Sequence, residues 1–444
     1  MADFRFSHDW LSAGDDSPAF RETSAQLGIY LGDLCLTRNE DIWSRTVRDS
    51  VLVSTYPLAM WFASSWWRLN WEPLSKKVGA LPSLDWRMAH EIGAANHGFV
   101  WPRILFASDG EVINVWAASA RTQSQSINYL NGLDCPQIVR IGDFQRTVDH
   151  FIEAVLSRLT AVDCNGTELA QLWKLILQDR ADPSISRIRR LEAEMGFDPE
   201  ECPEVELSKA LELQAQMGES AMSELAPIYG KREDGSGLDE IFELSTAVGL
   251  RGRPQVSRSD IGLEGTKGFL PWQQGVEAAR RLRAHIGNTD SLINSASLFG
   301  LLGLTETQIE QWADESKRPA AVATPVDHGC FNFVPRKRHR ISKRFEFSRF
   351  LADHLREKEG AENWLTSTDL ATARQKYQRA FAAEFLCPID PLIDFLGDDF
   401  SEPAIEEAAE RFDVSEQTVE SLLTNNRYLS PPHYGAEMPY RLAA

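Results

Sequence analysis

Residues 344–353, RFEFSRFLAD, and residues 380–388, AFAAEFLCP, decide the fold of the last third of the chain. Both stretches are rich in apolar residues at helical spacing, which predicts helices over 345–356 and 369–386. The second helix is expected to stop before Pro388, because proline cannot continue a helix. The C-terminal part of the chain is therefore predicted to be helical.

Shorter elements surround these two helices. Further helices are predicted over 401–412, which opens with a serine cap, and over 415–425. The apolar run 330–334 is typical of a short strand. Residues 251–254 interrupt the helical pattern and are typical of a linker, after which a helix begins again at Pro271.

The first 145 residues mix strand and helix signals. Alternating apolar residues predict a strand over 26–36. Two further apolar runs, 99–106 and 112–117, flank Ser108-Asp109-Gly110, which is typical of a β-hairpin turn. The N-terminal part is therefore predicted to be an α+β domain.

A tryptophan-rich stretch at 58–71 has the spacing of a helix with a broad aromatic face. It is too short to span a bilayer, which needs about 20 apolar residues. We expect these tryptophans to form the core of the N-terminal domain. The alternative is a partner-binding aromatic surface. Its members would be Trp61, Trp66, Trp67 and Trp71.

Charge limits the partners that the chain can bind. It carries 46 Lys and Arg against 65 Asp and Glu, a net charge of −19, which repels nucleic acid over most of a surface. Residues 191–250 are the most acidic part, and form either a solvated helix face or a docking surface for a basic partner. Six cysteines without a CxxC pair, and no secretory signal, favour the reducing cytoplasm and no membrane.

One dense basic run lies just before the first quoted stretch. Such runs can contact phosphates or an acidic partner, although a solvent-facing loop is the simpler interpretation. The run consists of Arg336, Lys337, Arg338, Arg340, Lys343 and Arg344.

The C-terminal third resembles the ImmA/IrrE family of metallopeptidase-like proteins. The residues that carry the resemblance are 344–353, 380–388 and the stretch 405–423, within a region of about 270–425. The resemblance implies a zincin-like helical domain. In that family the first helix carries HExxH, with two zinc-binding histidines and a glutamate that acts as general base. A glutamate about six residues before the Phe-Ala-Ala run supplies the third ligand.

This sequence departs from the family motif at every chemical position. The two histidine positions hold Arg349 and Asp353, the position of the base holds Phe350, and the third-ligand position holds Gln375. Arginine has no lone pair to give to a metal, and phenylalanine cannot take a proton from water. The resemblance therefore implies the scaffold without catalytic residues, metal or cofactor.

The replaced residues can interact with one another. Arg349 and Asp353 are four residues apart on one helix face, so they can form an ion pair. We expect this pair, with Gln375 as a hydrogen-bonding neighbour, to fill the space of the metal. A lone buried arginine would be costly, whereas a buried pair is tolerable.

These patterns together predict a mostly α protein. We expect an α+β domain at 1–145, an acidic helical region at 146–258, and an ImmA/IrrE-like pseudo-metallopeptidase domain at 259–430. A tail would follow at 431–444.

The expected function is non-catalytic: regulation, sensing or the binding of a protein partner in the bacterial cytoplasm. Relatives with the intact motif act as proteases on repressors in stress response and on mobile elements, so the resemblance implies a role in stress or antiphage-defence regulation. Two alternatives stay open. One is a metallopeptidase with a site rebuilt from Asp353, His354, Glu384 or a histidine from elsewhere in the chain. The other is a nucleic-acid-binding regulator that uses the basic run 336–344.

Overall fold

The computed structural model groups the chain into two compact units. The first runs over Met1–Pro203 and the second begins at Glu204. The predicted tail at 431–444 lies outside the described residues. The structure describes residues 1–11, 13, 17–74, 82–120, 125–231, 237–263, 270–313, 317–327, 329–358 and 363–430.

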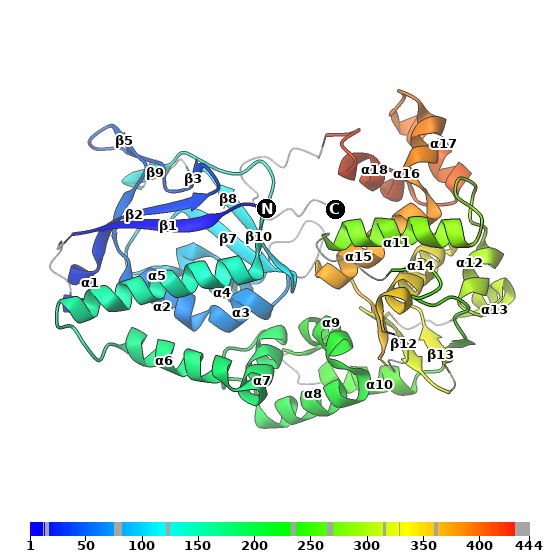
Figure 1. Cartoon of the computed structure of the whole chain (residues 1–444), viewed down its shortest axis with the longest axis horizontal. Helices are drawn as coiled ribbons and strands as arrows, with labels where there is room; N and C mark the ends of the chain where they lie inside the picture. The colour runs from blue at the N-terminus through cyan, green and yellow to red at the C-terminus, as the bar shows by residue number, and fades with distance from the viewer. Residues whose placement is uncertain are drawn as a thin grey trace. The chain divides into compact units, whose positions relative to one another are not determined.

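The first unit combines short strands with helices (Figure 1). Its strands are β1 (Phe4–Trp10), β2 (Ser24–Leu31), β3 (Leu34–Cys35), β4 (Asn39–Asp41), β5 (Thr46–Arg48), β6 (Val51–Ser54), β7 (Arg103–Ser108), β8 (Val112–Ala118), β9 (Ile127–Tyr129) and β10 (Gln137–Arg140). Its helices are α1 (Pro18–Glu22), α2 (Tyr56–Ser64), α3 (Trp66–Trp71), α4 (Leu84–His90), the 3-10 helix Ile92–Ala95, α5 (Ile141–Ala161), α6 (Glu168–Ala181) and α7 (Pro183–Glu194).

The strands of this unit form three antiparallel sheets. One has the order β1-β2-β3 with β6 also paired to β2, the second is β10-β8-β7, and the third is β5-β4-β9. The predicted hairpin is confirmed, since β7 pairs with β8 across a turn in which Gly110 has a φ of +95°. Glycine suits that turn because it adopts positive φ without a steric penalty.

The tryptophan-rich stretch forms part of the core of this unit, as expected. Trp61, Trp66 and Trp67 are buried, in one cluster with aromatic residues of the strands and of α5. Trp71 is partly buried under the guanidinium of Arg190, 4.1 Å from the ring centre. The alternative of a partner-binding surface is therefore wrong for these tryptophans, because the helices α2 and α3 turn their aromatic faces inward.

Replacing Trp67 by alanine should lower the free energy of unfolding by about 3–5 kcal/mol, because the indole fills a closed part of the core. The matched control is Trp43→Ala, since Trp43 is 86% exposed whereas Trp67 is 2% exposed. Urea unfolding followed by circular dichroism measures both changes. Equal stability of the two variants would contradict the core assignment.

The second unit is mainly helical. Its helices are α8 (Glu204–Met217), α9 (Glu219–Tyr229), α10 (Gly237–Thr246), α11 (Pro271–His285), α12 (Ser295–Leu301), α13 (Glu306–Gln311), α14 (Arg340–Arg356), α15 (Ala373–Leu386), α16 (Ile389–Leu396), α17 (Glu402–Phe412) and α18 (Glu416–Asn425). Its strands are β11 (Leu250–Gly252), β12 (Ala321–Pro325), β13 (Phe331–Val334) and β14 (Leu365–Ser367). The predicted region 146–258 is thus divided, with most of α5 and all of α6 and α7 in the first unit and α8 to β11 in the second.

The four strands form one antiparallel sheet in the order β11-β13-β12-β14. The predicted linker at 251–254 is wrong in part, because Arg251 and Gly252 belong to β11 and pair with β13. Leu250 and Gly252 are buried while Arg251 between them is exposed. So short a strand, with glycine at one inward position, carries no clear apolar pattern.

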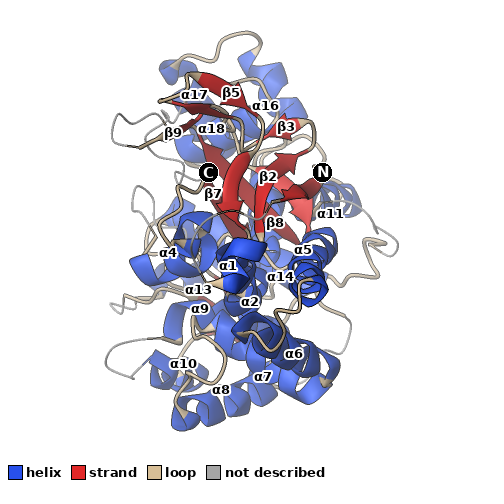
Figure 2. Ribbon diagram, turned by 90° about the vertical axis from the view of Figure 1, so that its left-hand side faces the viewer, coloured by secondary structure: helices blue, strands red, loops and turns tan. Residues whose placement is uncertain are grey.

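Helices α11, α14 and α15 pack against one another and hold the sheet's edge in place. Gly275 on α11 allows the close approach of α15, since a Cβ atom there would lie 2.3 Å from the carbonyl oxygen of Tyr377. The predicted mostly α fold, with a sheet-containing N-terminal part and a helical C-terminal part, is confirmed (Figure 2). None of the helices that the structure describes is long and apolar enough to span a bilayer.

Candidate functional site

The four positions that the resemblance aligns with the HExxH motif and its third ligand lie on α14 and α15. Arg349, Phe350 and Asp353 are buried on α14, and Gln375 is buried in the first turn of α15. Thr372 caps α15, since its hydroxyl accepts a hydrogen bond from the Gln375 N–H at 3.2 Å. Both helices pack together, and α14 also packs against the edge strand β14.

Arg349 does not pair with Asp353, so the predicted ion pair is wrong. The guanidinium of Arg349 donates to the Thr368 carbonyl at 2.6 Å and to the side-chain oxygen of Gln375. Gln375 is thus a hydrogen-bonding neighbour of Arg349, as expected. Burial, and then the charges of Arg379 and Arg336, lower the pKa of Arg349 to about 9. The side chain is still protonated at neutral pH and has no lone pair for a metal.

Asp353 is paired instead with Arg374, the residue before Gln375. The Arg374 Nε and Nη2 donate to the two carboxylate oxygens at 2.7 and 2.6 Å, a bidentate geometry. Both side chains are buried. Burial acts to lower the pKa of Arg374, but the charge of Asp353 outweighs it, so this pKa is raised above that of ordinary arginine. Arg374 is therefore charged at neutral pH.

The same side chains cover the free edge of β14. This strand pairs with β12 on one side only. On its other side, the Thr366 N–H donates to Asp353 at 2.9 Å and the Thr366 carbonyl accepts from Gln378 at 2.8 Å. The next outward groups are those of Thr368. Its N–H donates to Gln375 at 3.1 Å, and its carbonyl accepts from Arg349.

Side chains of α14 and α15 thus take the place of a neighbouring strand. We call the five residues involved the edge lattice: Arg349, Asp353, Arg374, Gln375 and Gln378. Because every outward backbone group of Thr366 and Thr368 is already bonded, an extended peptide cannot add to β14 while the lattice is intact.

A buried carboxylate from α9 extends the edge lattice. Glu224 accepts a hydrogen bond from the Thr372 hydroxyl at 2.6 Å and one from the Thr368 hydroxyl at 3.4 Å. Burial raises the pKa of Glu224, although Arg374 acts in the opposite direction. The site therefore draws on a helix that precedes the predicted domain 259–430.

Sequence reasoning missed Arg374, Gln378 and Glu224. Arg374 and Gln378 could have been suspected, because they lie beside Gln375 on a helix whose other residues are largely apolar. Glu224 carries no such signal, since it is one of many acids in the stretch 191–250.

The residues proposed for a rebuilt hydrolytic site do not come together. Asp353 is held by Arg374, and Glu384 is held by Arg280 at 2.7 Å. A ring nitrogen of His354 lies 3.1 Å from the Val256 carbonyl, and burial lowers the pKa of this histidine. Within the described ranges, no three His, Cys, Asp or Glu side chains are grouped so that they could hold a metal ion.

Most of the basic run is bonded inside the second unit. Arg336 donates to Asp369 at 2.8 and 2.7 Å and to Glu346 at 3.2 Å. Lys343 is buried and donates to the carbonyls of Ile309 and Trp312, and its pKa is lowered by that burial. Arg340 and Arg344 both bind the side chain of Asp413. These four cations therefore stabilise the second unit through their bonds within it.

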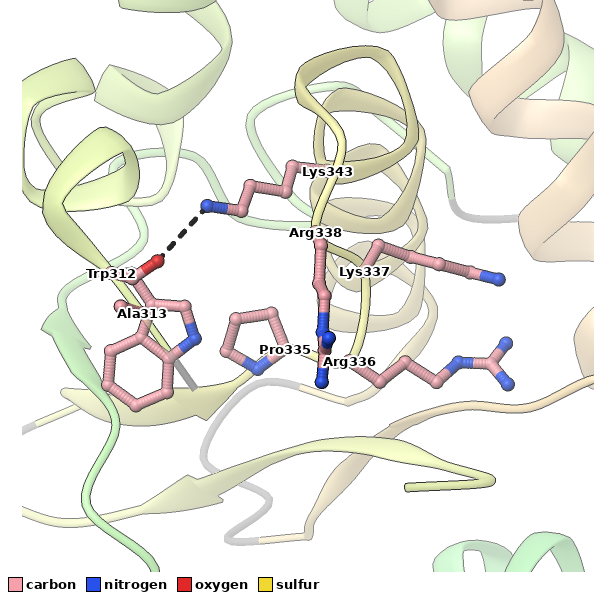
Figure 3. A pocket seen from close by; sticks show the side chains of 7 residues that line it. All are labelled: Trp312, Ala313, Pro335, Arg336, Lys337, Arg338 and Lys343. Carbon is pink, nitrogen blue, oxygen red and sulfur yellow. Dashed lines mark hydrogen bonds between the residues drawn. The ribbon is translucent and has the colours of Figure 1, made fainter. Parts of the chain in front are cut away.

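The remaining two cations, Lys337 and Arg338, line a hollow of about 220 Å³. Figure 3 shows this hollow, with the Trp312 indole on one side, Pro335 at its centre and the Lys343 ammonium bonded to the Trp312 carbonyl. The side chains of Arg336 and Lys337 point away from the indole. Arg336 and Lys343 also contribute to the lining of the hollow, but both are bonded within the fold.

Comparison of the chain with protein-family models, with curated proteins and with solved structures gave no match.

Replacing Asp353 by asparagine should destabilise the fold by about 3–5 kcal/mol, because it removes the bidentate counter-charge of the buried Arg374 and leaves Glu357, 3.8 Å away, as its remaining ion-pair partner in the described chain. Arg374→Met should have a similar effect, and the double variant should lose less than the sum of the two. Urea unfolding of the three variants measures this coupling. The control is Glu277→Gln, which removes the exposed i,i+4 pair with Arg281 and should change little. Strictly additive effects would contradict the pair.

Glu224 should make stability depend on pH. Its pKa is higher in the folded chain than the ordinary value of 4.5, so the folded state holds the proton more tightly. The contribution of Glu224 to stability should therefore be greatest below the ordinary pKa and fall as pH rises toward the folded pKa. Glu224→Gln should remove this fall, as measured by urea unfolding from acidic to neutral pH. Parallel curves for the wild type and the variant would contradict the assignment.

Proposed function

We propose that the chain is a non-catalytic regulatory protein that binds a protein partner through a metallopeptidase-like scaffold. In this proposal the C-terminal part is an ImmA/IrrE-like, zincin-like domain whose zinc site has been replaced by the edge lattice. The single observation that carries the proposal is that the side chains at these positions are bonded within the fold. Arg349 bonds to Gln375, Asp353 bonds to Arg374, and Arg349, Asp353 and Gln375 all bond to the backbone of Thr366 or Thr368 at the edge of β14.

A metallopeptidase needs three donors for the metal, a base for the bound water and room for the substrate. At the positions of the motif, the Nη2 of Arg349 donates to Thr368 and Gln375, while its Nε is buried without a partner among the described residues, and the oxygens of Asp353 accept from Arg374 and Thr366. At the position of the base, Phe350 packs in the core with its ring 5.5 Å from that of Phe333. The arrangement supports a structural role for this region.

The nucleic-acid alternative receives less support from the structure. Four of the six cations of the basic run are used within the fold, and the chain's net charge is −19. Binding to a polyanion grows with the number of phosphates that free cations can neutralise. We therefore favour a protein partner over DNA or RNA.

The biological setting follows from the resemblance alone. ImmA/IrrE proteases act in stress response and on mobile elements, so we propose a bacterial, cytoplasmic regulator in stress or antiphage defence. Loss of catalysis with retention of the scaffold fits a protein that holds a partner rather than cutting it.

The metal content of the purified chain tests this proposal. We expect no stoichiometric zinc in protein purified from zinc-supplemented cells, because Arg349 cannot ligate and Asp353 is already paired. A chelator should leave the melting temperature unchanged. Mass spectrometry of the metal and differential scanning calorimetry measure the two outcomes.

The controls for this test are Asp353→Asn and Glu277→Gln. One tightly held zinc ion per chain, lost in Asp353→Asn and retained in Glu277→Gln, would overturn the non-catalytic proposal. Zinc retained equally by both variants would show adventitious binding elsewhere and would leave the edge lattice as described.

A further inference from the structure

The first unit contains an edge strand that is treated differently from β14. Strand β1 pairs antiparallel with β2 over all seven of its residues and with no other strand among the described residues. It contains neither proline nor glycine, and no β-bulge interrupts its register. Prolines and β-bulges are features by which proteins usually protect an edge from pairing with another chain, and β1 has neither.

The direction of the backbone groups follows from the hydrogen bonds at the two ends of β1. The Gly32 N–H donates to the Asp3 carbonyl at 2.6 Å, and the Leu11 N–H donates to the Ser24 carbonyl at 2.8 Å. Odd-numbered residues of β1 therefore bond toward β2. In an antiparallel ladder the alternate residues direct their N–H and C=O groups away from that partner.

The outward groups belong to Phe4, Phe6, His8 and Trp10. The Phe4 carbonyl accepts a hydrogen bond from the Thr147 hydroxyl at 3.0 Å. For the other three residues, the described part of the chain supplies no hydrogen bond to the outward N–H and C=O groups. This is the opposite of β14, where side chains occupy every outward group of Thr366 and Thr368.

The side chains of β1 divide cleanly between two faces. Phe4 and Phe6 pack inward, with ring centres 5.7 Å from Phe144 and 4.3 Å from Phe151 of α5. On the other face, Arg5, Ser7 and Asp9 are exposed. Packing against α5 holds the strand in place. At its N-terminal end the outward Ala2 N–H donates to the Ile138 carbonyl of β10 at 2.9 Å and the Phe4 carbonyl is bonded to Thr147, so the open part of the edge is Phe6, His8 and Trp10.

We propose that β1 pairs with β1 of a second copy of this chain, antiparallel and about a two-fold axis at Ser7. This register places residue i opposite residue 14 − i, so that all seven residues are paired. It sets Phe6 opposite His8 of the second copy, and both belong to the set with outward backbone groups. The unpaired N–H and C=O groups can therefore bond to one another.

The charges of Arg5 and Asp9 favour a second copy as the occupant of the edge, and they favour this register over its neighbours. Arg5 lies opposite Asp9 of the second copy, and the two-fold axis repeats this pair, so two opposite-charge pairs form on the exposed face. A shift of the axis to Phe6 would place Asp3 opposite Asp9, a like-charge pair. A shift to His8 would leave Arg5 opposite Leu11. Cross-strand pairs of opposite charge favour a register, and like charges oppose it. The interface is isologous, as two-fold dimers require.

Charge-swap variants of the full chain test this proposal. Wild-type protein should sediment as a dimer in the micromolar range. Arg5→Asp alone and Asp9→Arg alone each place like charges opposite one another twice, so each should weaken the dimer by about tenfold or more. An equimolar mixture of the two variants restores both complementary pairs, and it should form a heterodimer. Analytical ultracentrifugation measures all four samples.

A backbone variant and a surface control complete the test. His8→Pro removes an N–H that β2 does not use, so it should leave the fold intact and abolish the dimer. Glu277→Arg changes an exposed charge of α11 and should leave the dimer unchanged. A monomeric wild type would overturn the proposal. A dimer that survives His8→Pro, or a mixture of the charge variants that stays monomeric, would overturn it as well.

Discussion

The buried ion pair between Arg374 and Asp353 is the interaction on which the second unit depends. It joins α15 to α14, and the same carboxylate accepts the Thr366 N–H, so it also fixes β14 to the helices. Arg374 reaches further, to the Ser220 hydroxyl of α9 at 2.8 Å and the Trp364 carbonyl at 3.1 Å. A buried charge of either sign would be costly alone, and the bidentate geometry with added backbone partners is what makes both tolerable. The positions of Gln375, Arg349 and Glu224 follow from this pair.

The two edge strands show two solutions to one constraint. Buried backbone groups must find hydrogen-bond partners, whereas exposed groups can bond to water or to another chain. Strand β14 is enclosed by α14 and α15, so polar side chains have to supply its partners. Strand β1 has α5 on one face and an exposed charged face on the other, and the described chain covers its edge only at the N-terminal end, where Ala2 and Phe4 are bonded to Ile138 and Thr147. The outward backbone groups of an edge strand are thus bonded to side chains at β14 and largely left open at β1.

Sequence reasoning predicted the helices α14 and α15, the hairpin β7–β8 and the tryptophan core, because each carries a strong periodic or turn signal. It placed Gln375 beside Arg349 but chose the wrong partner for Asp353. Spacing along one helix made Arg349 the natural candidate, whereas the observed partner comes from a helix twenty-one residues away. Contacts between helices depend on packing, which one sequence does not reveal. The short strand β11 was missed because its sequence carries no strand signal: its buried residues include a glycine and give no apolar pattern.

The edge lattice also has a consequence for evolution. In a chain descended from a metal-binding ancestor, a change of Arg349 to histidine would take a donor from Thr368 and Gln375, and a change of Asp353 to histidine would leave Arg374 with an uncompensated charge. Each single reversion therefore removes stability before any metal can bind. Several substitutions would have to occur together for a metal site to return. In such a chain the edge lattice would make the loss of a metal site self-reinforcing, because natural selection on folding alone would preserve the lattice.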